Sequence, residues 1–251
     1  MKRTIMKRHS VKSSSHPARA KDLSDHWDLT HLLNQPQEEF EHSIKRLDSQ
    51  VSKFESLRGG LSPDMSSKAF LDILRLNEAI STESAKVSAY AYLWFSENTK
   101  NLEARAFKTK VEERLTALQN RMLFFDLWWQ TVDEANAARL MESSGDVQYF
   151  LESIRRYKPH TLSEAEEKII NVKNTTGRHA VNTIYDVLTN GLMFMLTVKG
   201  QRKTLTREQL SMYIRSSEPK IREAAYREMY RVFSSNHDVL GEIYTTLVND
   251  W

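Results

Sequence analysis

Long stretches of this 251-residue chain carry apolar side chains at the spacing of one helix face. The clearest stretch runs from Pro36 to Arg58, where an apolar residue recurs every three or four positions. The chain has only seven glycines and five prolines, too few for a turn-rich β-protein. We therefore predict a mainly α fold, an antiparallel helical bundle of long hairpins, with one small β-hairpin near residues 192–205.

Glycine, serine and proline suggest where the first helices end and begin. Gly59 and Gly60 are expected to end the first helix by accepting positive φ. Ser62 and Pro63 are expected to begin the next, since proline costs no hydrogen bond in a first turn. The second helical pattern then continues to Trp94. It predicts either one long helix or two helices that meet near residues 81–84.

The third long pattern runs from about Leu102 to Trp129 and ends in an apolar, aromatic run. Residues 123–129 read LFFDLWW, which is apolar on every face of a helix. Such a run is either a ligand box of aromatic rings or a segment surrounded by protein. We interpret it as core, because packing is much the commoner use of such a pattern in helical proteins.

Two helix starts carry a complete N-terminal signature. Ser163 and Glu166 stand three residues apart, as do Thr206 and Gln209, and each pair predicts a capping box. Ahead of the first box, Phe150, Leu151 and Ile154 fall on one face of a short helix that should run through Arg156 and stop before Lys158 and Pro159. Leu205 and Leu210 occupy the hydrophobic-staple positions of the second box.

The helical pattern gives way once to a strand pattern. Residues 192–198 and 202–205 read as two short strands around the turn Lys199–Gly200–Gln201. A lone hairpin is marginal in water, so it should lie against the helices. Pro219 is expected to open a final helix whose apolar series continues to Trp251.

The segment from Tyr149 to Ile170, YFLESIRRYKPHTLSEAEEKII, resembles the N-terminal half of oligoendopeptidase F and its relatives, the thimet-oligopeptidase-like zinc metallopeptidases. The resemblance runs from about Asp22 to the end of the chain and includes further segments in the same order. These segments are Trp27–Thr30, Tyr90–Phe95, Thr99–Ala106, Gly177–Arg178 and Arg222–Asp250.

The resemblance implies a zinc held by two histidines of an H-E-x-x-H helix and by a later glutamate. This chain cannot form that helix, because no two of its eight histidines lie three or four positions apart. The histidines are His9, His16, His26, His31, His42, His160, His179 and His237. We therefore expect no catalytic and no metal-binding residue here, and we leave the binding residues unassigned.

The resemblance also implies a role for the chain. We expect the N-terminal, substrate-enclosing part of a zinc oligopeptidase, inactive and free of zinc when alone. Its expected partners are an oligopeptide substrate and a C-terminal catalytic portion beyond Trp251. We divide it into a basic tail (1–21), an N-terminal helical lobe (22–176) and the start of a peptidase domain (177–251).

The formal charge of +3 is unevenly distributed. Residues 1–21 hold seven of the 36 basic residues and none of the 33 acidic ones. Such a tail could attract nucleic acid or an anionic membrane, but its serines and few apolar residues favour a disordered leader. Without a cysteine, a signal-like apolar core or a long apolar run, the chain is expected to be soluble and cytoplasmic.

Two basic clusters are candidate binding sites. The first contains Arg155, Arg156, Lys158 and His160, which could grip a carboxylate or complement the dipole at a helix end, and we favour the structural role. The second is Arg178–His179, a poor metal site and a plausible surface pair. Two other functions stay open: a stand-alone helical interaction module, and a nucleic-acid-binding protein led by the tail.

Overall fold

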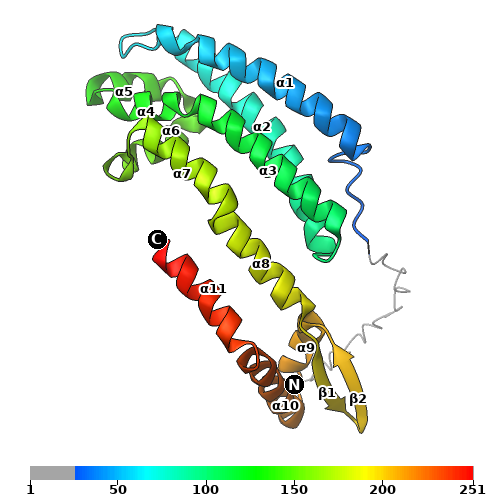
Figure 1. The fold of residues 1–251 in the computed structure, drawn as a ribbon. Helices are drawn as coiled ribbons and strands as arrows, with labels where there is room; N and C mark the ends of the chain where they lie inside the picture. The colour runs from blue at the N-terminus through cyan, green and yellow to red at the C-terminus, as the bar shows by residue number, and fades with distance from the viewer. Residues whose placement is uncertain (1–25, 251) are drawn as a thin grey trace, which may run out of the picture.

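The computed structural model describes residues 26–250, and within that range the chain is mainly helical, with one antiparallel hairpin (Figure 1). The predicted fold class is confirmed. The basic tail, residues 1–21, lies outside the described residues.

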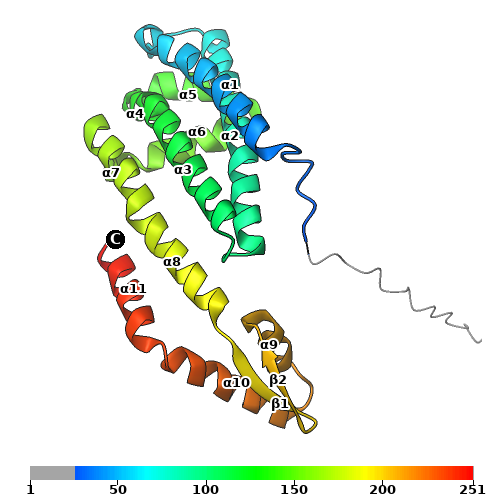
Figure 2. The same cartoon turned by 45° about the vertical axis from the view of Figure 1, so that its right-hand side comes forward.

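The first three helices are long and lie side by side in both views, each antiparallel to the one before it (Figures 1 and 2). They are α1 (Pro36–Ser56), α2 (Ser67–Glu97) and α3 (Leu102–Met122). The predicted face of α1 is buried at Phe40, Leu47, Val51 and Phe54. The predicted bundle is therefore present.

Two details of these helices differ from the sequence-based expectations. Gly59 and Gly60 form a 3₁₀ turn, η1 (Arg58–Gly60), without positive φ, so they do not cap α1 through a left-handed conformation. The second helix begins at Ser67 instead of at residues 62–63, because the Ser66 hydroxyl accepts the Ala69 backbone N–H at 3.2 Å. It then continues for 31 residues without interruption, which is the one-helix alternative of the sequence-based expectation.

The third pattern divides at Leu123, where α3 ends and α4 (Phe124–Thr131) begins. Phe125 and Trp129 of α4 are buried against α1 and α2: the Phe70 and Trp129 rings lie 5.0 Å apart, and the Trp129 Nε1 donates to the Leu151 carbonyl oxygen at 2.9 Å. These contacts confirm the core interpretation of the aromatic run.

Three helices and two 3₁₀ turns follow α4. They are α5 (Glu134–Glu142), η2 (Gly145–Val147), α6 (Gln148–Arg156), η3 (Lys158–His160) and α7 (Glu164–Thr176). The predicted short helix is α6, and its Leu151 and Ile154 are buried as expected. Phe150 is 45% exposed, so its assignment to the buried face was wrong. Its ring instead lines a surface groove described below.

The Ser163 capping box at the start of α7 is confirmed. No residue of α7 is buried, and polar groups attach the helix to the bundle. Arg58 pairs with Glu164 at 2.7 Å, and the Asn171 side chain donates to the Asn120 side chain at 2.8 Å. The chain then passes through Gly177 into α8 (Arg178–Gly191).

The predicted hairpin consists of β1 (Phe194–Val198) and β2 (Gln201–Leu205), so residues 192 and 193 stay outside the first strand. The register pairs Phe194 with Leu205, and Lys199 and Gly200 make the turn with positive φ. The hairpin packs on α9 (Arg207–Ile214) and α10 (Pro219–Ser234), as expected. The Thr206 capping box is confirmed, and both staple leucines are buried in the same small core.

The expected final helix is two helices, α10 and α11 (His237–Asn249), separated at Ser235 and Asn236. The Asn236 side-chain amide donates to the Val232 carbonyl oxygen at 2.9 Å and so competes with the helical ladder. Helix α11 then runs back beside α8 (Figures 1 and 2).

The apolar cores form two separate regions: one within α1–α6, and one within the hairpin, α9 and α10. Helices α7 and α8 join these regions. The division at residues 176 and 177 coincides with the α7–α8 junction and stays a prediction. None of the helices between residues 26 and 250 is long and apolar enough to cross a membrane.

Candidate functional site

The described residues do not provide a metal centre. Over residues 26–250, no group of three or more histidine, aspartate or glutamate side chains is placed to hold an ion. The donor set of a zinc site is therefore not assembled there, and no zinc step is assigned to these residues.

The structure instead shows a groove of about 560 Å³ on the surface of the bundle, between α2 and α3. The α2 wall is made of small residues, among them Ser81, Ser84 and Ser88, which leave room beside α3. Apolar side chains form the floor, including Phe54, Ile80 and Phe125 of the core. The groove is thus a concave, mainly apolar site that is open to solvent.

Asp126 is the distinctive polar group of this groove. It lies in the first turn of α4 and is half-buried among the apolar walls. Its carboxylate makes no hydrogen bond or ion pair with the described residues, and burial alone raises its pKa to about 6. A partly buried carboxylate without a counter-charge is uncommon in a folded protein.

Two other ionisable groups line the groove, Glu112 of α3 and His179 of α8. Glu112 is paired with the Lys108 ammonium at 2.7 Å, and Lys108 itself lies outside the lining. The lining contains neither lysine nor arginine. At neutral pH its formal charge is therefore negative, and Asp126 is the acid that lacks a partner.

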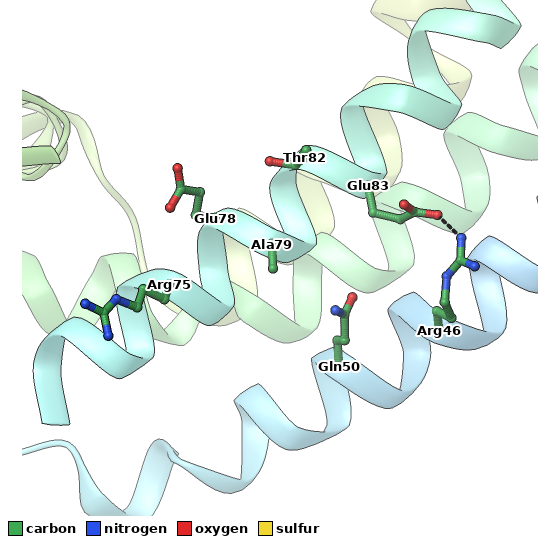
Figure 3. A pocket seen from close by; sticks show the side chains of 7 residues that line it. All are labelled: Arg46, Gln50, Arg75, Glu78, Ala79, Thr82 and Glu83. Atoms are coloured by element: carbon green, nitrogen blue, oxygen red, sulfur yellow. Dashed lines mark hydrogen bonds and ion pairs between the residues drawn. The ribbon is translucent and has the colours of Figure 1, made fainter. Parts of the chain in front are cut away.

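A second, polar pocket of about 360 Å³ lies on the α1–α2 surface (Figure 3). Arg46 and Glu83 are paired across it at 2.5 Å. Burial raises the pKa of Glu83, but hydrogen bonds from Ser43 and Arg46 outweigh that effect and hold the pKa below its usual value. The Gln50 side-chain oxygen is buried without a hydrogen-bond partner. Two arginines and two glutamates line this pocket, so its lining carries no net formal charge.

The Arg155 cluster does not form a joint binding site. Arg155 is largely buried and donates to the Trp129 and Val132 carbonyl oxygens at 3.0 and 2.7 Å, near the C-terminal end of α4. Arg156 points to solvent and lies over the Tyr149 ring. Lys158 and His160 belong to the exposed turn η3. Arg155 also pairs with the Glu134 carboxylate of the neighbouring helix α5 at 2.5 Å, so it grips a carboxylate within the fold and is not a solvated helix end.

The pair Arg178–His179 lies at the start of α8, and His179 reaches the groove beside Asp126 and Phe150. From the two basic clusters named as candidate binding sites, the sequence therefore contributed one groove residue, His179, without revealing the groove. The signal that was passed over was Asp126, a single acid inside an otherwise apolar run. Small residues at positions 77, 81, 84, 85 and 88 of α2 were a second signal.

Comparisons with known proteins agree with the resemblance. Residues 128–194 match the N-terminal M3 peptidase family described as Oligopeptidase F. Over 222 residues the chain is 23% identical to an oligoendopeptidase F homolog of Borreliella burgdorferi, and over 213 residues it is 24% identical to the group B oligopeptidase PepB of Streptococcus agalactiae. These alignments cover 88% and 82% of the chain but only 36% and 35% of the relatives, so the chain spans about a third of their length.

Among solved structures, oligoendopeptidase-F from Enterococcus faecium has a similar fold. The TM-score is 0.68 at 17% identity, and the match covers 85% of this chain and 43% of the other. At this identity the likeness concerns the fold. The sequence motifs and the matched relatives confirm the resemblance to oligoendopeptidase F, and the chain corresponds to the N-terminal part of those relatives.

Proposed function

We propose that this chain is the N-terminal, substrate-enclosing part of a zinc metallo-oligoendopeptidase that hydrolyses short peptides. The observation that supports this most is the alignment with two named oligopeptidases over most of the chain but only about a third of their length. The cytoplasmic location and the division at residues 176 and 177 are part of the same proposal.

In this proposal the chemistry belongs to residues that this chain does not contain. A metal-bound water would attack the peptide carbonyl, with a glutamate as general base. The contribution of this chain is to bind and enclose the peptide. Its helical bundle is suited to that role because α1–α3 pack against one another and contribute to two apolar cores.

Exposed apolar side chains support the proposal that a further protein segment packs against this chain. Helices α7, α8 and α11 carry several large apolar residues that are at least half exposed. They are Ile169, Val172, Ile184, Val239, Tyr244 and Val248. Exposed apolar residues of this kind commonly mark a contact with another protein segment. We propose that those of α7, α8 and α11 contact the catalytic portion.

The reading frame that contains this sequence tests the proposal. We expect it to encode an H-E-x-x-H motif after Trp251, followed by a later glutamate. A frame without that motif would contradict the proposal and favour the stand-alone helical interaction module, which would use the same exposed faces to bind a partner helix.

A further inference from the structure

The α2–α3 groove combines two features that one kind of ligand would satisfy. Its walls are apolar along most of their length, and a half-buried carboxylate, Asp126, stands among them without a counter-ion. A ligand with an aliphatic stem and a cationic end would cover the walls and pair with the carboxylate.

From this geometry we infer that the groove binds the lysine or arginine side chain of a peptide, with Asp126 as its counter-ion. The side-chain stem lies against the apolar floor, and the cationic nitrogen donates to the Asp126 carboxylate. That the bound peptide is a substrate rests on the proposed function, whereas the binding itself does not.

The electrostatics of the lining favour this ligand over an anion or a neutral chain. Glu112 is already paired with Lys108, so Asp126 is the carboxylate that attracts a cation, and the lining contains no lysine or arginine that would repel a cation or satisfy Asp126. Ser81 and Ser88 of α2 are exposed, and their hydroxyl groups are available to the peptide backbone. A neutral ligand of the same shape would leave the Asp126 carboxylate desolvated and unpaired, which is costly.

The pKa of Asp126 gives the interaction a pH signature. A cation binds the ionised carboxylate, so affinity should fall as the pH drops through about 6. The other titratable groups that line the groove are Glu112 of α3 and His179 of α8, and α2 contributes none. A protonated His179 would also repel a cation, so His179→Gln separates the two effects.

The test is a titration of the 251-residue chain with each of two tripeptides, in which changes in NMR chemical shifts measure the affinity. One is acetyl-Leu-Lys-Phe-amide, and the other has norleucine in place of lysine. We expect the lysine peptide to bind at least about tenfold more tightly, in line with a charge-assisted hydrogen bond. Asp126→Asn should remove that preference. The matched control Asp72→Asn changes an exposed acid on the same bundle and should keep it.

Between pH 7.5 and 5 the affinity of the wild-type chain for the lysine peptide should fall about tenfold. His179→Gln should retain a fall, and adding Asp126→Asn to His179→Gln should abolish it. Circular dichroism of each variant confirms that it is folded. Equal affinity for both peptides, no binding of either, or an unchanged preference in Asp126→Asn would overturn the inference. None of these results would bear on the proposed function, which depends on the downstream motif and on hydrolysis.

Discussion

Arg155 of α6 holds the backbone of Val132: its Nη1 donates to the Val132 carbonyl oxygen at 2.7 Å, and the same nitrogen reaches the Trp129 carbonyl oxygen at 3.0 Å. Both acceptors belong to buried residues near the end of α4, where a helix leaves carbonyl groups without partners. One guanidinium thus joins α6 to the aromatic core.

Replacing Arg155 with methionine should destabilise the chain by about 2–3 kcal/mol, because two carbonyl groups at a buried helix end lose their donor. The matched control is Arg156→Met. The Arg156 side chain is exposed, and its ion pair with Glu152 is long at 3.6 Å. Its effect should lie within about 0.5 kcal/mol. Urea unfolding at pH 7 measures both, and equal losses in the two variants would refute the assigned role of Arg155.

Asp126 should reduce stability at neutral pH. Burial raises its pKa from 3.8 to about 6, so between these values the folded chain binds more protons than the unfolded chain. The contribution of this group to stability therefore falls as the pH rises through that window. Asp126→Asn should be more stable than wild type by about 2 kcal/mol at pH 7.5, with the difference vanishing near pH 4. A pH-independent difference would show that the carboxyl is not buried as described.

A side chain at Gly177 should destabilise the chain. A Cβ there would lie 2.9 Å from the Lys173 carbonyl oxygen, which is fixed in the last turn of α7. We expect Gly177→Ala to cost about 1–2 kcal/mol. Gly241 of α11 has open space around it, so Gly241→Ala should stabilise by about 0.5–1 kcal/mol. Thermal melts of the two variants should shift in opposite directions, and a shared direction would contradict the contact at the α7–α8 junction.

The exposed faces of α7, α8 and α11 should make the isolated chain associate or bind hydrophobic dye more than a typical monomer does. Replacing Ile169 and Val172 of α7 with serine should lower dye binding. Leu102→Ser at the start of α3 is the control, since that residue is equally exposed but lies elsewhere. A monodisperse monomer without dye binding would argue against a missing neighbour.

Local signals in the sequence predicted local structure well. Ser163 with Glu166 and Thr206 with Gln209 were found as capping boxes because both partners lie within one turn. Apolar periodicity located the helices, but it could not show the interruptions at Leu123 and Asn236, where the pattern continues through the break. At Asn236 the competing hydrogen bond from the side chain decided the outcome.

The groove was harder to predict, because its lining comes from six helices, α1, α2, α3, α4, α6 and α8, that meet only in the folded chain. Asp126 was visible in the sequence as an acid in an apolar run, but its missing partner is a property of the packing. Phe150 shows the same limit: its helical position suggested burial, whereas the fold places its ring at the groove. The family resemblance identified the chain without locating this site.

The most direct measurement of the central claim compares the 251-residue chain with the protein made from its whole reading frame, for zinc content and for hydrolysis of a short peptide. The account predicts no stoichiometric zinc and no hydrolysis for the chain alone, and one zinc with chelator-sensitive hydrolysis for the whole product. One zinc per chain, or peptide hydrolysis that depends on a histidine of these 251 residues, would contradict it.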